Sequence, residues 1–183
     1  WGRKARWLAQ MANEDTGFGS VDDKGIKNIF ASGGGYEHIK DMKTIGEISR
    51  DDAKRLRTIA VPVGVIAGLI PSTNPTSTAL YKAEIAIKAG NAIVFSPHPS
   101  AAKCTLKAAE VMREAAIKAG APEGVIGCVS MPTMAATKEL MHCKEDAPTL
   151  PTGGPGMVTA DYSAGQPTTP AGTGPHPAPP PRT

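Results

Sequence analysis

A strand–turn–helix pattern occurs three times in succession between Ile59 and Cys143, and this repeat limits the folds that the chain can adopt. The apolar run from Ile59 to Ile70 predicts a buried strand, and a helix follows from Pro75 to a terminating glycine, Gly90. The same pattern returns at 91–120 and again at 124–143. Strands that alternate with helices through short loops predict an α/β fold, with a parallel sheet that carries helices on both faces.

The regions on either side of the repeat differ from it in composition. Residues 1–58 are charge-rich with a helical pattern, interrupted by the glycine run 33–35, and predict a helical segment whose first helix, 1–17, buries an apolar face on the sheet. The α/β domain is expected at 59–165, with a weaker last strand near 149–152. Most of the 17 prolines lie at or after Pro148, so 166–183 is expected to be an irregular, proline-rich tail.

Composition argues against several classes of function. The net charge is only +3, and basic residues are not interleaved with aromatic ones, which account for 4% of the chain, so nucleic-acid binding is not expected. No apolar run approaches the roughly 20 residues that cross a membrane. Three cysteines without CxxC spacing predict reduced thiols in a cytoplasmic protein and no metal site.

Four turns fall where the predicted strands end, at 71–76, 96–99, 131–134 and 152–156. In a parallel sheet the carboxyl ends of the strands meet at one edge, where ligands bind. These turns contain hydroxyl groups, glycines and helix-starting amides, which suit phosphate and ribose groups. Each turn alone is more simply loop chemistry, and none is a GxGxxG motif, but the four together predict a nucleotide site.

Three longer motifs carry a resemblance to a known family. The runs VPVGVIAGLIPSTNPTSTALYKAEIAIKAGNAIVFSPHPSA, AGAPEGVIGCV and TGGPGMV resemble the acylating branch of the aldehyde dehydrogenase superfamily. The resemblance implies a Rossmann-like nucleotide-binding domain and the oxidation of a short-chain aldehyde to acyl-CoA. It implies NAD or NADP as cofactor, coenzyme A as co-substrate and a homo-oligomer when full length. The protein is then cytoplasmic, with a bacterial microcompartment shell as an alternative setting.

The resemblance also implies roles for individual residues. The PSTNP turn is expected to supply a donor to the oxyanion of the reacting aldehyde, with Asn74 as first choice and Thr73 as its rival; the alternative role of Asn74 is a helix cap. His98 is interpreted as a nucleotide-stacking or packing residue in preference to a general base. The expected cofactor-binding residues are Pro71, Ser72, Thr73, Ser96, Pro97, His98, Pro99, Gly124, Pro132, Thr133, Thr152, Gly153 and Gly154.

None of the three cysteines matches the nucleophile of that branch. Cys104 and Cys128 are interpreted as packing thiols, and Cys143 beside His142 points to a different helix face from its neighbour. The nucleophile and the catalytic domain are therefore expected to lie outside this sequence. After TGGPGMV the chain departs from the family pattern, with His176 and Pro177 where Gly and Asn are expected. An alternative interpretation is a non-catalytic nucleotide-binding or assembly remnant of such an enzyme.

Overall fold

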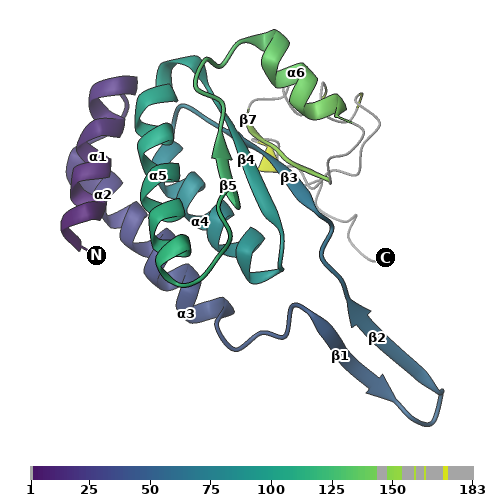
Figure 1. The fold of residues 1–183 in the computed structure, drawn as a ribbon. Helices are drawn as coiled ribbons and strands as arrows, with labels where there is room; N and C mark the ends of the chain where they lie inside the picture. The colour runs from purple at the N-terminus through teal and green to yellow at the C-terminus, as the bar shows by residue number, and fades with distance from the viewer. Residues whose placement is uncertain (1, 144–147, 154–158, 160–162, 164–170, 173–183) are drawn as a thin grey trace, which may run out of the picture.

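The computed structural model describes residues 2–143, 148–153, 159, 163 and 171–172. Its centre is a four-stranded parallel sheet in the order β5-β4-β3-β6 (Figure 1). The strands are β3 (Val65–Ile70), β4 (Ala92–Pro97), β5 (Ile126–Cys128) and β6 (Thr149–Leu150). The predicted α/β fold with alternating strands and helices is therefore confirmed.

Two helices cover one face of this sheet, α4 (Pro75–Lys88) and α5 (Ala102–Lys118). Leu80, Ile93 and Phe95 lie between these helices and the strands and are fully buried. Helix α4 begins with Pro75 in its first turn, and Gly90 follows its end with a φ of 74°, a conformation that favours glycine. The helix bounds predicted from proline and glycine therefore hold for α4.

Helix α6 (Met134–His142) belongs to the other side of the sheet. It follows β5 and precedes β6, which lies on the far side of β4 and β3 in the sheet, so a right-handed crossover places it opposite α4 and α5. A short 3-10 helix, η2 (Pro99–Ala101), leads into α5. The last described strands are β7 (Thr152–Gly153) and β8 (Ala171–Gly172), which pair in parallel. Residues 171–172 therefore form a strand within the segment that was expected to be irregular.

The amino-terminal helices pack outside α4 and α5 (Figure 1). They are α1 (Gly2–Thr16), α2 (Val21–Ile29), the π-helix η1 (Phe30–Gly34) and α3 (Gly35–Ile39). Helix α1 packs mainly against α2 and α5, so the expectation that its apolar face lies on the sheet was wrong. The glycine run was expected to interrupt the helical pattern, but the chain continues through it as a π-helix, which π-type hydrogen bonds allow without a break.

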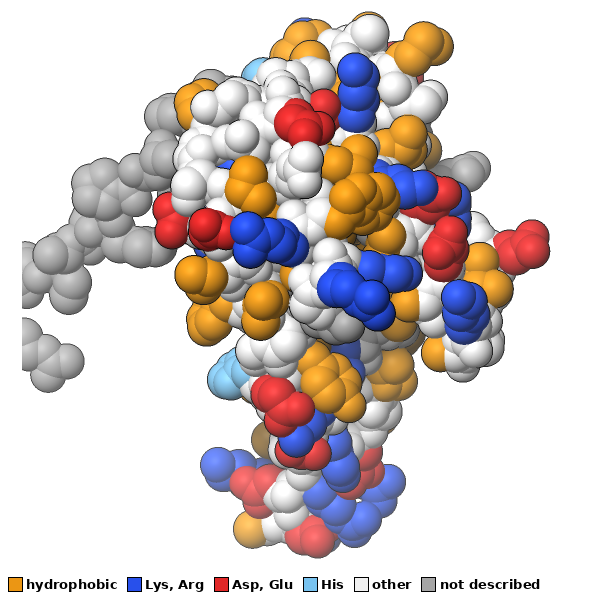
Figure 2. Space-filling view, turned by 90° about the vertical axis from the view of Figure 1, so that its left-hand side faces the viewer, with side chains coloured by type: hydrophobic (Ala, Val, Ile, Leu, Met, Phe, Trp, Pro, Cys, Tyr) orange, Lys and Arg blue, Asp and Glu red, His pale blue; other side chains and the backbone are white. Residues whose placement is uncertain are grey.

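Residues 46–60 form a β-hairpin, so the prediction of a wholly helical segment over 1–58 was wrong there. Strands β1 (Gly46–Asp51) and β2 (Leu56–Ala60) pair antiparallel and project from the body of the molecule (Figure 1). Charged side chains of both signs occur in runs along the hairpin, at 50–52 and 54–55, and Figure 2 shows charged side chains gathered at its projecting end. Two ion pairs, Arg50–Asp52 and Arg57–Glu47, lie along the hairpin. Because of these charges, the sequence lacks the alternation of apolar and polar residues that indicates a strand.

The apolar run that begins at Ile59 enters the sheet later than predicted. Val61 and Val63 are exposed, and the parallel strand starts at Val65. The buried side chain of Asn91 fixes this entry, because its Oδ1 accepts hydrogen bonds from the backbone amides of Val63 at 2.6 Å and Gly64 at 3.1 Å. The apolar run therefore predicted a strand that is too long, because its first residues lie on the surface before the chain enters the sheet.

Candidate functional site

Two pockets lie beside the carboxyl ends of the parallel strands, and most of the residues predicted for the site line one of them. We call the smaller one, of about 310 Å³, the edge cleft. Ends of β3 and β4, the turn before α6 and Thr152 enclose it. The predicted residues that line it are Pro71, Ser96, Pro97, His98, Pro99, Pro132, Thr133 and Thr152.

Hydrogen bonds between elements hold the floor of the edge cleft. Ser96, at the end of β4, is buried, and its hydroxyl lies 2.8 Å from that of Thr137 in α6. Thr133 caps α6, because its Oγ1 accepts from the amide of Ala136 at 3.1 Å. Helix α6 therefore begins at the rim of the cleft, where the unpaired amides of a first helical turn suit an anionic group.

His98 has a defined local role in the turn after β4. Its Nδ1 accepts a hydrogen bond from the backbone amide of Ser100 at 3.2 Å and lies 2.8 Å from the hydroxyl of the same residue. An Nδ1 that accepts an N–H carries no proton, so the ring proton of the neutral side chain is on Nε2. This arrangement caps η2, so His98 has a structural role in the turn, and its preference for stacking over general-base chemistry stays a prediction.

The remaining predicted cofactor residues do not line the edge cleft. Ser72 and Thr73 lie in the turn before α4, outside its lining. Gly124 precedes β5, at the amino end of that strand, so the structure places it away from the carboxyl edge and its predicted role was wrong. Gly153 is in β7 and pairs with Gly172, and Gly154 lies outside the described residues.

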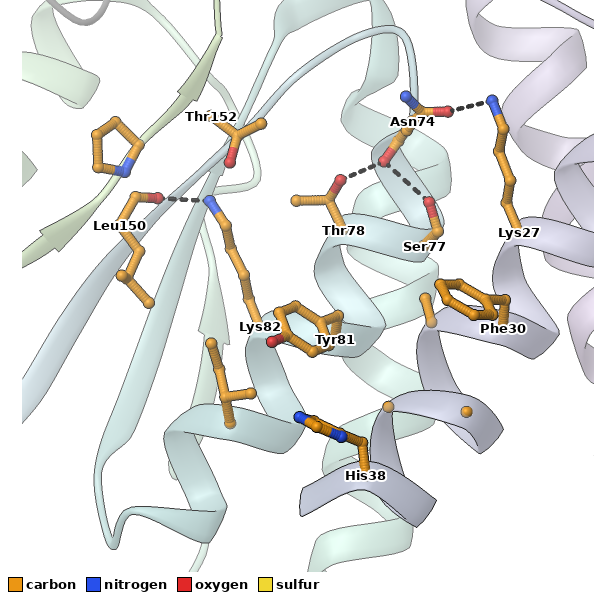
Figure 3. A pocket seen from close by; sticks show the side chains of 15 residues that line it. Lys27, Phe30, His38, Asn74, Ser77, Thr78, Tyr81, Lys82, Leu150 and Thr152 are labelled. Atoms are coloured by element: carbon orange, nitrogen blue, oxygen red, sulfur yellow. Dashed lines mark hydrogen bonds between the residues drawn. The ribbon is translucent and has the colours of Figure 1, made fainter. Parts of the chain in front are cut away.

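Asn74 lines the larger pocket, of about 660 Å³, which we call the α4 pocket. It lies between α4 and the segment α2–η1–α3, and its lining includes Phe30, His38 and Tyr81 (Figure 3). Asn74 is the N-cap residue of α4, as the alternative role predicted, but its side chain makes no capping hydrogen bond. Thr152 lines both pockets, which places the α4 pocket and the edge cleft next to each other.

Three lysines that the sequence reasoning did not single out hold segments beside the α4 pocket, and two of them, Lys27 and Lys82, line it. Lys24 donates to the carbonyl of Thr73 at 2.9 Å, and Lys27 donates to Oδ1 of Asn74 at 3.0 Å. The buried Lys82 of α4 donates to the carbonyls of Leu69 at 2.8 Å and of Leu150, which joins the ends of β3 and β6. Lys82 lies within the largely apolar stretch 79–87 of α4, and a lysine there was the available signal.

Two of the three cysteines are buried or half-buried thiols with raised pKa values. Burial, together with the carboxylate of Asp15, raises the pKa of Cys104 to about 12. Burial raises the pKa of Cys128 to about 11. Thiols with such pKa values stay protonated at neutral pH and are poor nucleophiles. Cys143 is exposed at the end of α6 and lines neither pocket.

The part of the chain that the structure describes has neither a metal-binding cluster nor a membrane-spanning helix. No cluster of three or more His, Cys, Asp or Glu side chains there has the arrangement needed to hold a metal ion. None of the described helices combines the length and the apolar character that crossing a membrane requires.

Comparison with known proteins places this arrangement in a family. The model of the aldehyde dehydrogenase family matches residues 19–154. The bifunctional aldehyde-alcohol dehydrogenase AdhE of Escherichia coli K12 is 50% identical over 167 residues, which are 91% of this chain and 19% of that protein. The predicted resemblance is therefore confirmed, and the chain spans only a fraction of the length of the curated relatives it matches.

Solved structures support the same placement. The acetylating aldehyde dehydrogenase of Geobacillus thermoglucosidasius superposes with a TM-score of 0.89 at 60% identity, over 91% of this chain and 37% of that one. The propionaldehyde dehydrogenase of Rhodopseudomonas palustris with bound propionyl-CoA gives a TM-score of 0.77 at 32% identity, over 90% of this chain and 36% of that one. The first is an acetylating enzyme, and the second is bound to an acyl-CoA.

Proposed function

Because this chain belongs to the aldehyde dehydrogenase family, we propose that it supplies the nucleotide-binding region of a CoA-acylating aldehyde dehydrogenase. The observation that carries the proposal is the convergence of eight predicted residues on the edge cleft. The α4 pocket, with Asn74, adjoins that cleft through Thr152. One pocket then has the chemistry of a nucleotide site and the other that of a site for the reacting aldehyde.

The proposed reaction converts an aldehyde, an oxidised nicotinamide cofactor and CoA into acyl-CoA, the reduced cofactor and one proton. When bound, NAD or NADP supplies the hydride acceptor and CoA takes the acyl group. The residues present suit such ligands: hydroxyls of Thr133 and Thr152, the start of α6 and the His98 ring line one cleft. CoA and the cofactor both carry an adenosine phosphate, which this cleft is suited to accept.

Asn74 is proposed to donate a hydrogen bond to the oxyanion that forms when a thiolate adds to the aldehyde carbon. Its side chain lines the α4 pocket, and Oδ1 is already engaged by Lys27, which leaves the Nδ2 group as the donor. Thr73, the rival donor, is exposed and lines neither pocket. The thiolate itself is proposed to come from a cysteine outside this sequence, because burial keeps Cys104 and Cys128 protonated.

Assembly and cellular setting belong to the same proposal. The proposed enzyme is a cytoplasmic homo-oligomer that acts on a short-chain aldehyde, with a bacterial microcompartment as the alternative setting. The second candidate function is a non-catalytic nucleotide-binding remnant, which the protonated state of the buried thiols favours for the chain in isolation.

NADH formation from acetaldehyde, NAD and CoA tests the proposal on the product of the complete reading frame that contains this sequence. We expect a rate that requires all three reactants. Replacing Asn74 by Ala should lower kcat by about 10²- to 10³-fold, the usual effect of losing one oxyanion donor. Thr73→Ala is the matched control and should retain activity. A CoA-independent rate, or a large loss in Thr73→Ala with none in Asn74→Ala, contradicts the proposal.

A further inference from the structure

The amide of Asn74 is held by a side chain from a different helix. Lys27 lies in α2, and its Nζ donates to Oδ1 of Asn74 at 3.0 Å across 47 positions of sequence. Figure 3 shows the lysine reaching toward the amide oxygen, with the amide nitrogen on the side away from Lys27. The contact therefore distinguishes the two ends of the amide.

An asparagine amide has an accepting end and a donating end, and rotation about its last bond exchanges them. An ammonium group can only donate, so it pairs with the oxygen and excludes the rotated amide. With Oδ1 engaged, Nδ2 keeps its hydrogens for other acceptors, and its own contact with the Thr73 hydroxyl is long, at 3.5 Å. A hydrogen bond from a cation to the oxygen also polarises the amide, which strengthens its N–H groups as donors.

Helix α2 contacts the turn before α4 and the first turn of α4 at three neighbouring points. Lys24, Lys27 and Asn28 share one helix face, because residues three and four apart are neighbours. Lys24 holds the carbonyl of Thr73 at 2.9 Å, and Oδ1 of Asn28 accepts from the Thr76 hydroxyl at 2.8 Å. Lys24 and Asn28 are buried, whereas Lys27 is exposed. Lys24 therefore anchors the backbone of the turn and Asn28 anchors the start of α4, whereas Lys27 contacts only the side chain of Asn74.

We propose that Lys27 is a positioning residue for catalysis, which orients the Asn74 amide so that Nδ2 faces the reacting oxygen. This inference rests on the proposed function, because it assigns Lys27 a role through the oxyanion donor. Lys27 contributes no proton and no covalent bond to the reaction. Its removal frees the amide to rotate, and the donor is then presented only part of the time.

Steady-state kinetics of the full-length enzyme test this assignment with three variants. Lys27→Met removes the donor with little change in length, and we expect kcat to fall about tenfold while the KM for NAD and the melting temperature stay unchanged. Lys27→Arg keeps a cationic donor and should restore most of the rate. Lys40→Met is the matched control, because Lys40 is exposed and pairs with Glu37 at the surface.

A double-mutant cycle separates this inference from the proposed function. Adding Lys27→Met to Asn74→Ala should cause no further loss, since nothing is left to orient. If Asn74→Ala loses activity but Lys27→Met does not, the inference is overturned and the proposed function stands. If Asn74→Ala is fully active, the oxyanion assignment fails and the inference fails with it. An equal tenfold loss from Lys27→Met in both backgrounds would show that Lys27 acts independently of Asn74.

Discussion

Glu84 is a carboxyl group whose environment opposes its charge. Its Oε2 is buried without a hydrogen-bond partner in the described structure, and a Cβ on Gly35 would lie 3.3 Å from that oxygen. Burial raises the pKa of Glu84 from 4.5 to about 7. Between pH 4.5 and about 7 the folded state therefore keeps the Glu84 proton, which the unfolded chain has lost. The free energy of unfolding falls as pH rises through this range.

Replacing Glu84 by Gln removes the charge and keeps the shape, so it should stabilise the protein where the native carboxyl is ionised. We expect a higher melting temperature for Glu84→Gln at pH 8, and a difference that shrinks toward zero as pH falls from about 7 to 4.5. Differential scanning calorimetry across this range measures it. Exposed Glu123→Gln serves as the control. A constant difference at every pH would contradict the account of Glu84.

For single residues, the sequence identifies candidate site residues but not the side chains that contact them. The type of residue at Asn74 suggested either a donor or a cap, and only the geometry showed that its side chain does not cap α4. Lys27 reads as an ordinary charge on an amphipathic helix, because its partner lies 47 positions away. Hydrogen bonds between distant segments leave no local pattern, so the contact of Lys27 with Asn74 could not be predicted.

At the scale of elements, Gly68 allows β3 and β4 to pack closely. A Cβ at this position would lie 2.9 Å from Cδ1 of Phe95 and 3.1 Å from Cδ1 of Ile93, both fully buried. We expect Gly68→Ala to lower the free energy of unfolding by about 1–3 kcal/mol through overpacking. Gly127→Ala in β5 is the matched control, since its nearest contact would be 3.4 Å, to Val94. Chemical denaturation compares the two; equal losses would refute this packing argument.

The hairpin β1–β2 should be the least protected regular structure among the described strands. A two-stranded ribbon that projects into solvent has little apolar burial to stabilise it, and Leu56 and Ile59 are about 60% exposed. Hydrogen exchange monitored by mass spectrometry should show amides of 46–60 exchanging at least about tenfold faster than those of β3 and β4. Equal protection of hairpin and sheet would contradict this expectation.

Elements whose ends are marked by proline or glycine were predictable from the sequence, and elements without such residues were not. The repeat of β3–α4 and β4–α5 is marked by Pro75, Gly90 and Gly120, so their order and type follow from the sequence. The hairpin was missed because charges break its alternation. The glycines at 33–35 suggested a break where a π-helix keeps the chain helical, since backbone hydrogen bonds there need no side chain.

At the scale of the whole molecule, the parallel topology is what assembles the site. Pro71 and Thr152 lie far apart in the sequence, but they meet at one cleft because every parallel strand ends at the same edge. Topology therefore placed eight of the predicted cofactor residues together. It also explains the error at Gly124, which stands at the beginning of β5 and so belongs to the opposite edge.

Nucleotide binding to the edge cleft is the central claim, and a titration of NAD into two tryptophan variants of the full-length protein tests it most directly. Met134 and Met131 are both exposed, but only Met134 lines the edge cleft. We predict that Met134→Trp, which fills the cleft, raises the Kd for NAD at least about tenfold, while Met131→Trp leaves it unchanged. NAD affinity that is the same in both variants and the unmodified protein would contradict the assignment of this cleft.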